Sequence, residues 1–315
     1  MLKRKLGNTG LEVAPLALGT NVFGWTIDEP QSFRILDCFV DAGLNLVDTA
    51  DVYSRWKPGN SGGESETIIG NWLKSSGKRN KIILATKVGS DMGDGKKGLS
   101  KKYIIQAVEA SLKRLQTDHI DLYQSHFDDG VTPVEETMEA YYELVKAGKV
   151  YSVGASNISV ERLKESISAS NDQGFPAYQT LQPLYNLYDR DLYEREYEPV
   201  CIDKGLGVIC YYSLASGFLT GKYRSEADLA KSVRGQGISK YLDKKGMDIL
   251  KYLDEKSQEH NATPAAIALA WLMARPSVTA PIASANTVEQ LNELIKATEI
   301  NLGIPAKSST ADTSI

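Results

Sequence analysis

Cysteine and histidine are scarce in this chain of 315 residues, which contains only three of each. The six residues are Cys38, Cys201 and Cys210, and His119, His126 and His260. The cysteines form no CxxC pair, and no histidine belongs to an HExxH motif. These gaps argue against a disulfide framework and against a zinc site, so we expect no bound metal. Unpaired cysteines are typical of a reducing compartment, which predicts a cytoplasmic protein.

An excess of positive charge and long apolar runs are also missing. The chain has 36 Lys and Arg against 40 Asp and Glu, for a net charge of −4. No stretch approaches the roughly 20 apolar residues of a membrane-spanning helix. The first residues lack the apolar core of a secretory signal. We therefore expect neither nucleic acid nor a membrane as a partner.

What the sequence does contain is a regular alternation of short apolar runs and amphipathic stretches. The apolar runs predict strands near residues 16–18, 44–48, 81–88, 118–126, 150–155, 178–182, 207–212 and 278–282. The amphipathic stretches predict helices near residues 31–42, 64–74, 101–115, 134–147, 159–170, 191–204, 245–260, 264–274 and 287–298. Strands joined by crossover helices pair in parallel, and eight such repeats close a barrel.

The predicted fold class is therefore α/β, a (β/α)8 TIM barrel formed by a single domain over residues 1–315. An N-terminal β-hairpin at residues 2–13, turning at Gly7–Gly10, can plug the bottom of the barrel. Residues 302–315 are polar and small, and we expect a mobile tail there. The alternative is an open doubly wound sheet, but the G-x-G-x-x-G fingerprint is missing after Gly19.

Polar side chains follow three consecutive strands at their carboxyl ends. Asp48 ends the second predicted strand and Tyr53 lies just beyond it, whereas Lys87 and His126 end the third and fourth. In a barrel these ends share one face, where the chemistry of this fold is found. Each residue also has an ordinary interpretation, as a turn aspartate, a loop tyrosine, an exposed lysine or a core histidine. For the ordinary interpretations to hold, four independent coincidences would have to occur at adjacent strand ends, which weakens them as a set.

Together these four residues predict an acid/base centre. A tyrosine has a pKa of about 10, and a neighbouring ammonium lowers it by stabilising the phenolate. A carboxylate keeps a buried lysine charged, and an imidazole can orient a carbonyl oxygen. The set is suited to protonating a carbonyl as it accepts hydride.

Seven linked motifs from about Leu6 to Leu302 resemble the aldo-keto reductase family in order and spacing. They are NxxDTADxY (Asn45–Tyr53), ATK (Ala85–Lys87), DLYQSH (Asp121–His126), GASN (Gly154–Asn157), QPLYN (Gln182–Asn186), YSLASGFLTGKY (Tyr212–Tyr223) and APIASANTVEQL (Ala280–Leu291). The resemblance implies a barrel that reduces aldehydes or ketones with a nicotinamide cofactor. It implies Tyr53 as general acid, Lys87 lowering its pKa, Asp48 paired with Lys87, and His126 orienting the carbonyl.

The resemblance also implies a set of cofactor-binding positions. They are Thr20, Asn21, Asp48, Ser156, Asn157, Gln182, Tyr212, Ser213, Leu214, Ser216, Gly217, Leu219, Gly221, Lys222, Ser284, Gln290 and Glu293. Tyr212 matches the aromatic residue that stacks on the nicotinamide ring, or it is an ordinary core aromatic residue. Residues 213–221 resemble the loop over the pyrophosphate, where small residues allow close backbone approach.

The match loosens at the adenosine end. Many relatives have Lys or Arg there for the 2′-phosphate, and Asn where this chain has Leu294, whereas this chain offers Ser284, Gln290 and Glu293. The resemblance implies NADP(H) as the favoured cofactor, whereas these residues leave NAD(H) open as the cofactor. Lys222 or Arg224 can supply the missing charge, unless both face solvent.

A small-molecule carbonyl compound or sugar is the expected substrate. The predicted pocket wall consists of Trp25, Tyr53, Trp56, His126 and Phe127, although the two tryptophans can equally belong to rim packing. Two other functions stay open. One is a cofactor-holding regulatory protein that resembles potassium-channel β subunits, and the other is a lyase or isomerase that uses Lys87 as a Schiff base.

Overall fold

Eight parallel strands form one curled sheet in the computed structural model, which describes residues 2–231 and 235–303. The strands are β3 (Ala17–Gly19), β4 (Leu46–Asp48), β5 (Ile83–Val88), β6 (Ile120–Ser125), β7 (Val150–Ser156), β8 (Thr180–Gln182), β9 (Gly207–Val208) and β10 (Ile282–Ala283). They lie side by side in chain order from β3 to β9, with β10 next to β3. The two edge strands of this sheet are therefore β10 and β9, and the curl of the sheet brings them toward each other.

The two edges of the sheet are joined by backbone contacts. Val208 of β9 forms a parallel bridge with Val278, just before β10. The Thr279 and Ile282 amides donate to the Val208 and Cys210 carbonyls at 2.8 and 2.9 Å. These bonds close the (β/α)8 barrel and exclude the open-sheet alternative.

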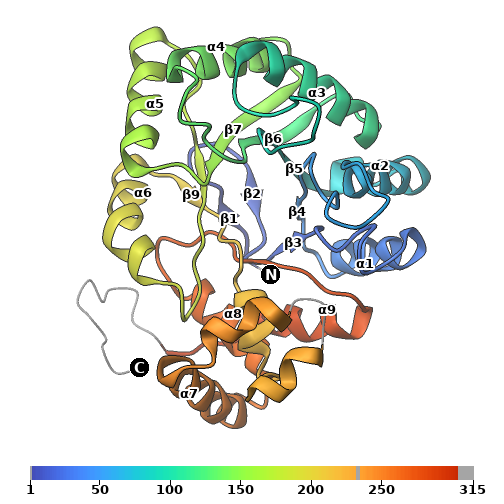
Figure 1. Ribbon diagram of the computed structural model, residues 1–315, viewed down its shortest axis with the longest axis vertical. Coiled ribbons are helices and arrows are strands. Elements are labelled where there is room, and N and C mark those ends of the chain that lie inside the picture. The colour runs from blue at the N-terminus through green and yellow to red at the C-terminus, as the bar shows by residue number, and fades with distance from the viewer. Residues whose placement is uncertain (1, 232–234, 304–315) are drawn as a thin grey trace.

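Nine α-helices are described, and they surround the sheet (Figure 1). They are α1 (Glu29–Asp41), α2 (Glu64–Ser76), α3 (Lys101–Leu115), α4 (Val134–Lys146), α5 (Val160–Gln173), α6 (Glu198–Lys204), α7 (Lys244–His260), α8 (Pro264–Met273) and α9 (Val288–Ile295). Helix α8 is buried from Ala265 to Met273, because α7, α9 and two short 3-10 helices pack against it. None of the described helices has both the length and the apolar character needed to cross a membrane.

The barrel interior is apolar at its lower end. Leu46, Ala85 and Leu122, which face inward from β4, β5 and β6, belong to one buried cluster. The predicted hairpin is confirmed as β1 (Arg4–Lys5) paired antiparallel with β2 (Glu12–Val13). Leu6 and Val13 of this hairpin are fully buried in the same cluster, so the hairpin closes the barrel bottom as a plug.

Two segments differ clearly from the predicted elements. The helix expected over 191–204 contains a π-helical turn, Tyr193–Tyr197, before α6. Pro199 explains the break, because proline has no N–H to continue the regular bonding. The last strand is shorter and later than the expected 278–282. Residues 304–315, most of the expected mobile tail, lie outside the described residues.

Candidate active site

A polar layer lies above the apolar layer inside the barrel. Side chains alternate between the two faces of a strand, so residues two positions beyond an inward-facing residue also face inward. Asp48, Lys87, Gln124 and Gln182 follow this rule in β4, β5, β6 and β8, and all four are buried. Strand pairing places Lys87 opposite Gln124 and Asp48 opposite Ala85. The strand ends therefore bring Asp48, Lys87 and Gln182 together, as the sequence predicted, and they add Gln124 to this group.

Lys87 is the hub of this layer. Its Nζ donates to Asp48 Oδ2 at 2.7 Å, to the Thr49 carbonyl at 2.8 Å and to Tyr53 Oη at 3.1 Å. Asp48 Oδ1 also accepts from Gln182 Nε2 at 2.9 Å. A buried ion pair is tolerated when its remaining donors and acceptors are satisfied, and here both partners have additional bonds.

Burial and the neighbouring charges shift the pKa values of Tyr53 and Lys87 in opposite directions. Burial raises the pKa of Tyr53, the Lys87 ammonium lowers it, and Asp48 adds to the rise. Lys87 thus acts in the predicted direction, but burial outweighs it and the net pKa lies above the ordinary value. Burial alone disfavours the Lys87 ammonium, but Asp48 and Tyr53 offset this and raise its pKa. A charged Lys87 is a poor Schiff-base nucleophile, which counts against the lyase alternative.

His126 lies beside Tyr53, with ring centroids 5.9 Å apart. Its amide donates to the Val88 carbonyl at 2.8 Å, which fixes it against the end of β5. Burial, helped by the Lys87 charge, lowers the pKa of His126 well below its ordinary value. The imidazole is therefore neutral near pH 7 and can orient a carbonyl oxygen without adding charge.

Ser156 and Asn157 continue the site from the end of β7. Ser156 Oγ donates to the Gln182 carbonyl at 2.8 Å. Asn157 Nδ2 donates to the His126 carbonyl at 2.9 Å, and its Oδ1 accepts from Tyr211 Oη at 2.8 Å. The Asn157 backbone has a φ of 46°, in the left-handed region that asparagine tolerates better than most residues.

One cavity of about 1390 Å³ connects these groups. Its lining includes most of the predicted residues: Asn21, Asp48, Tyr53, Trp56, His126, Phe127, Ser156, Asn157, Gln182, Tyr212, Ser213, Leu214, Ser216, Gly217, Lys222, Ser284, Gln290 and Glu293. Five predicted residues, Thr20, Trp25, Lys87, Leu219 and Gly221, are not part of it. Thr20 and Leu219 are fully buried beneath the lining, and Trp25 contacts Trp56 edge-on at 5.6 Å.

The part of the cavity around Tyr212 offers an exposed aromatic ring and a sharply turned loop. Tyr212 is 53 % exposed there, which offers a flat aromatic surface. The backbone of Tyr212, Ala215, Ser216 and Gly217 has positive φ, so the loop turns sharply along the lining. Gly217, with φ 101°, adds no side chain where a phosphate would approach. The residues present therefore fit a nicotinamide dinucleotide.

The adenosine end is mixed in charge. Arg224 donates to both carboxylate oxygens of Asp254, at 2.8 and 2.7 Å, so this arginine is already engaged. The lysine and arginine side chains lining the described cavity are Lys97 and Lys222. Glu293 also lines it and accepts from Lys296 at 2.6 Å.

Three buried residues near the site were missed or left without a role by the sequence analysis. Ser90, three residues beyond Lys87, contacts His126 Nδ1 through its Oγ at 2.9 Å. Gln124 Nε2 lies 3.4 Å from Asp48 Oδ1. Burial and the Glu66 charge raise the pKa of Asp51 well above its usual range. The position of Ser90 just after a predicted strand was a signal that could have marked it as a site residue. Its contact with His126 could not be read from the sequence, because it depends on strand pairing.

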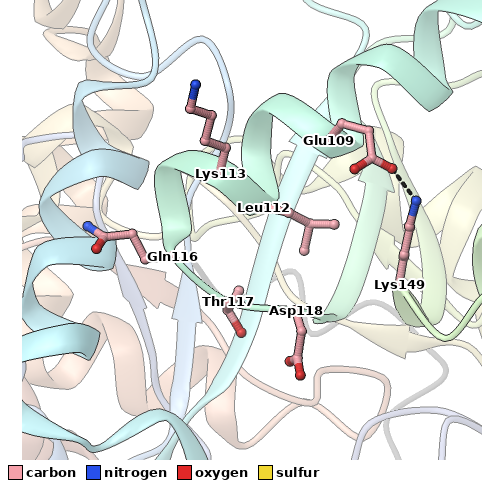
Figure 2. A pocket seen from close by; sticks show the side chains of 7 residues that line it. All are labelled: Glu109, Leu112, Lys113, Gln116, Thr117, Asp118 and Lys149. Atoms are coloured by element: carbon pink, nitrogen blue, oxygen red, sulfur yellow. Dashed lines mark hydrogen bonds and ion pairs between the residues drawn. The ribbon is translucent and has the colours of Figure 1, made fainter.

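A second depression, of about 730 Å³, lies at the amino ends of β6 and β7. It is formed by the end of α3 and the following loop, and Figure 2 shows Glu109 and Lys149 joined across it by an ion pair. The catalytic candidates lie at the opposite strand ends. This depression has no part in the site.

Comparison with known proteins agrees with the geometry. The aldo/keto reductase family model matches residues 15–306. The chain is 42 % identical to the uncharacterized oxidoreductase YrpG of Bacillus subtilis, over 94 % of this chain and 91 % of that protein. It is 37 % identical to the aldo-keto reductase YhdN of the same organism (70 % and 64 %). It is also 32 % identical to a probable voltage-gated potassium channel subunit beta of Arabidopsis thaliana (95 % and 92 %). This chain therefore belongs to the aldo/keto reductase family and is an NAD(P)H-dependent oxidoreductase.

Proposed function

We propose that the protein reduces the carbonyl group of an aldehyde, ketone or sugar, with Tyr53 as the general acid. The observation that carries this proposal is Lys87, whose ammonium bridges the Asp48 carboxylate and the Tyr53 hydroxyl. The same contact supports the reverse direction, in which Tyr53 accepts a proton from an alcohol. The proposed catalytic residues are Asp48, Tyr53, Lys87 and His126.

The proposed reaction needs one hydride and one proton. A nicotinamide cofactor, when bound, would supply the hydride for the carbonyl carbon. Tyr53 donates its hydroxyl proton to the carbonyl oxygen, and its raised pKa keeps that proton available near neutrality. Lys87 stabilises the phenolate that remains, while Asp48 holds Lys87 charged. Neutral His126 donates a hydrogen bond that orients the carbonyl oxygen.

We propose NADP(H) as the cofactor, with NAD(H) as the alternative. Tyr212 would support the nicotinamide ring, Ser156, Asn157 and Gln182 its carboxamide, and residues 213–222 the phosphates. Lys222 lines this part of the cavity and offers a charge to a phosphate. Glu293 and the engaged Arg224 argue in the other direction.

The cavity mouth favours a substrate with an apolar group. Trp56 and Phe127 are 45 % and 48 % exposed, and Phe127 stacks on His126 at 5.0 Å. Such surfaces bind an aromatic ring or the apolar face of a sugar. We propose a small-molecule substrate and, from the three free cysteines, a cytoplasmic location.

The second candidate function is regulatory. It is favoured by the similarity to a probable potassium channel subunit beta over nearly the full length of both chains. A protein of this kind would hold the cofactor with little turnover. Rapid oxidation of bound cofactor by simple aldehydes would decide against it.

The first experiment is a titration of the purified protein with NADPH and NADH, followed by quenching of tryptophan fluorescence and then by turnover with aromatic aldehydes. We expect tight NADPH binding, weaker NADH binding and multiple turnovers. Preference for NADH would reject the NADP(H) proposal, and binding without turnover would favour the regulatory function. Binding of neither nucleotide would contradict the proposed cofactor site.

A further inference from the structure

His126 and Ser90 form a buried pair that the roles proposed above leave unexplained. The Ser90 Oγ and the His126 Nδ1 are 2.9 Å apart, and the two residues are only 8 % and 9 % exposed. The pairing of β5 with β6 creates this contact, because Val88 lies opposite Ser125 and the His126 amide bonds to the Val88 carbonyl. Each residue lies just beyond one of these strand ends.

The direction of this hydrogen bond sets the position of the imidazole proton. A neutral imidazole has one N–H and one acceptor nitrogen, whereas a serine hydroxyl can donate or accept. Within the described part of the chain, the Ser90 hydroxyl has His126 Nδ1 as its hydrogen-bond partner. If Nδ1 carried the proton, the Ser90 O–H would lose this acceptor, and a mostly buried donor without an acceptor is unfavourable. The favoured arrangement has Ser90 donating to Nδ1.

We propose that Ser90 is a positioning residue that holds the proton of neutral His126 on Nε2, the ring nitrogen left for the cavity. This inference rests on the proposed reduction, in which His126 must donate to the carbonyl oxygen. With the proton on Nδ1, Nε2 would present a lone pair to that oxygen and repel it. Ser90 thus acts through His126 rather than on the substrate.

The imidazole is restrained on its other sides as well. Phe127 stacks on it at 5.0 Å, Tyr53 lies edge-on at 5.9 Å, and Asn157 holds its backbone carbonyl at 2.9 Å. Burial and the Lys87 charge keep the ring neutral by lowering its pKa. These contacts fix where the ring lies, but none of them selects which nitrogen carries the proton. Ser90 makes that selection.

The test is long-range ¹H–¹⁵N correlation NMR of histidine-labelled protein bound to NADPH. His126 is one of three histidines and is assigned by the signals lost in His126→Gln. We expect the wild type to show the Nε2–H tautomer at His126. Ser90→Ala should give a mixture of tautomers, and Ser90→Thr, which keeps the hydroxyl, should restore the wild-type pattern. Ser170→Ala removes another buried serine hydroxyl, in α5, and should leave the His126 signals unchanged.

Turnover provides the second readout. We expect Ser90→Ala to lower kcat/KM by about 10-fold or more, because a positioned donor contributes about 10²–10⁴-fold, while NADPH affinity stays unchanged. An Nδ1–H tautomer in the wild type, or a Ser90→Ala spectrum identical to wild type, would overturn the inference. A tautomer change without any reductase activity in the wild type would instead reject the proposed reaction and leave the Ser90–His126 coupling in place.

Discussion

Lys87 shows at the scale of single residues how burial and charge compete in this site. The side chain is fully buried, a situation that lysine avoids unless it is paired. Its contacts with Asp48, Thr49 and Tyr53 satisfy the ammonium and leave the Tyr53 hydroxyl at the cavity surface. We propose that the ion pair serves the reaction through Tyr53 and is not simply a stabilising contact.

Tyr53→Phe tests the proton donor. The variant loses the hydroxyl but keeps the ring that packs edge-on against Trp56 at 5.7 Å. We expect kcat to fall by about 10²–10⁴-fold, the usual contribution of a positioned general acid. Fluorescence titration should give an NADPH affinity close to wild type. Strong residual turnover would remove Tyr53 from the proposed role.

Lys87→Met tests the charge beside Tyr53 through the pH profile. In reduction Tyr53 must be protonated, so activity falls as pH rises through its pKa. Lys87 lowers that pKa, and its removal should move the alkaline limb of kcat/KM to higher pH and slow the reaction at every pH. Stopped-flow rates measured from neutral pH to well above pH 10, where a Tyr53 with a raised pKa titrates, check this, with circular dichroism to confirm folding at each pH. An unshifted alkaline limb would contradict the role of Lys87.

Asp51 predicts an effect of pH on stability. Its folded-state pKa is raised, mainly by burial and by Glu66, so the native state holds its proton more tightly than the unfolded chain does. Stability from this group is present below the unfolded pKa of about 3.9 and is lost as pH rises through the folded value. Asp51→Asn should therefore reduce this loss, as measured by urea midpoints at pH 5–8. A midpoint difference from wild type that does not change with pH would contradict the prediction.

Helices α2 and α3 show at the scale of elements how a missing side chain sets the packing behind the site. Gly70 of α2 lies against the end of α3, where a Cβ atom would come within 2.1 Å of the Arg114 carbonyl oxygen. On the same side, Glu66 of α2 is fully buried and accepts from Arg114 Nε at 2.6 Å and from Thr86 Oγ1 at 2.6 Å. Close approach of the two helices makes this ion pair possible.

Gly70→Ala separates local preference from packing. Alanine favours a helix over glycine by about 1 kcal/mol, but overpacking costs about 1–3 kcal/mol. Because the clash is with backbone, we expect net destabilisation and a lower urea midpoint. Lys74→Ala, at an exposed position of the same helix, should leave the midpoint nearly unchanged. A Gly70→Ala protein as stable as wild type would show that the helices can separate at little cost.

At the scale of the whole molecule, the apolar plug and the candidate active site lie at opposite ends of the barrel. The hairpin β1–β2 closes the bottom with Leu6 and Val13, whereas the cavity opens at the carboxyl ends of the strands. Gly7 allows this closure, because its φ is +57° and a Cβ would lie 2.3 Å from the Gln179 carbonyl oxygen.

Leu6→Ala tests this separation. Removing a fully buried leucine should lower the free energy of unfolding by about 2–5 kcal/mol in urea titrations. The kcat of the folded enzyme at 25 °C should stay within about twofold of wild type, because a distant, independent site adds little coupling. Leu2→Ala, at a position 86 % exposed, is the matched control and should change neither quantity. A large loss of kcat in Leu6→Ala would show that plug and site are coupled.

The sequence by itself determined the order of elements and named most of the residues of the candidate site. The apolar runs predicted the strands. Asp48 and Lys87 lie two positions beyond Leu46 and Ala85, and alternation along a strand, which is a local property, places each pair on one face. The family motifs then indicated the cofactor positions, most of which line one cavity.

Only the tertiary structure decided which groups meet across strands and which effect prevails there. Closure through Val208 and Val278, the engagement of Arg224 by Asp254, and the Ser90–His126 contact all join residues that no sequence period connects. The pKa of Tyr53 is the clearest case, because Lys87 lowers it while burial raises it. Burial is a property of the packed barrel, so the sign of that balance could not be predicted from the residue types alone.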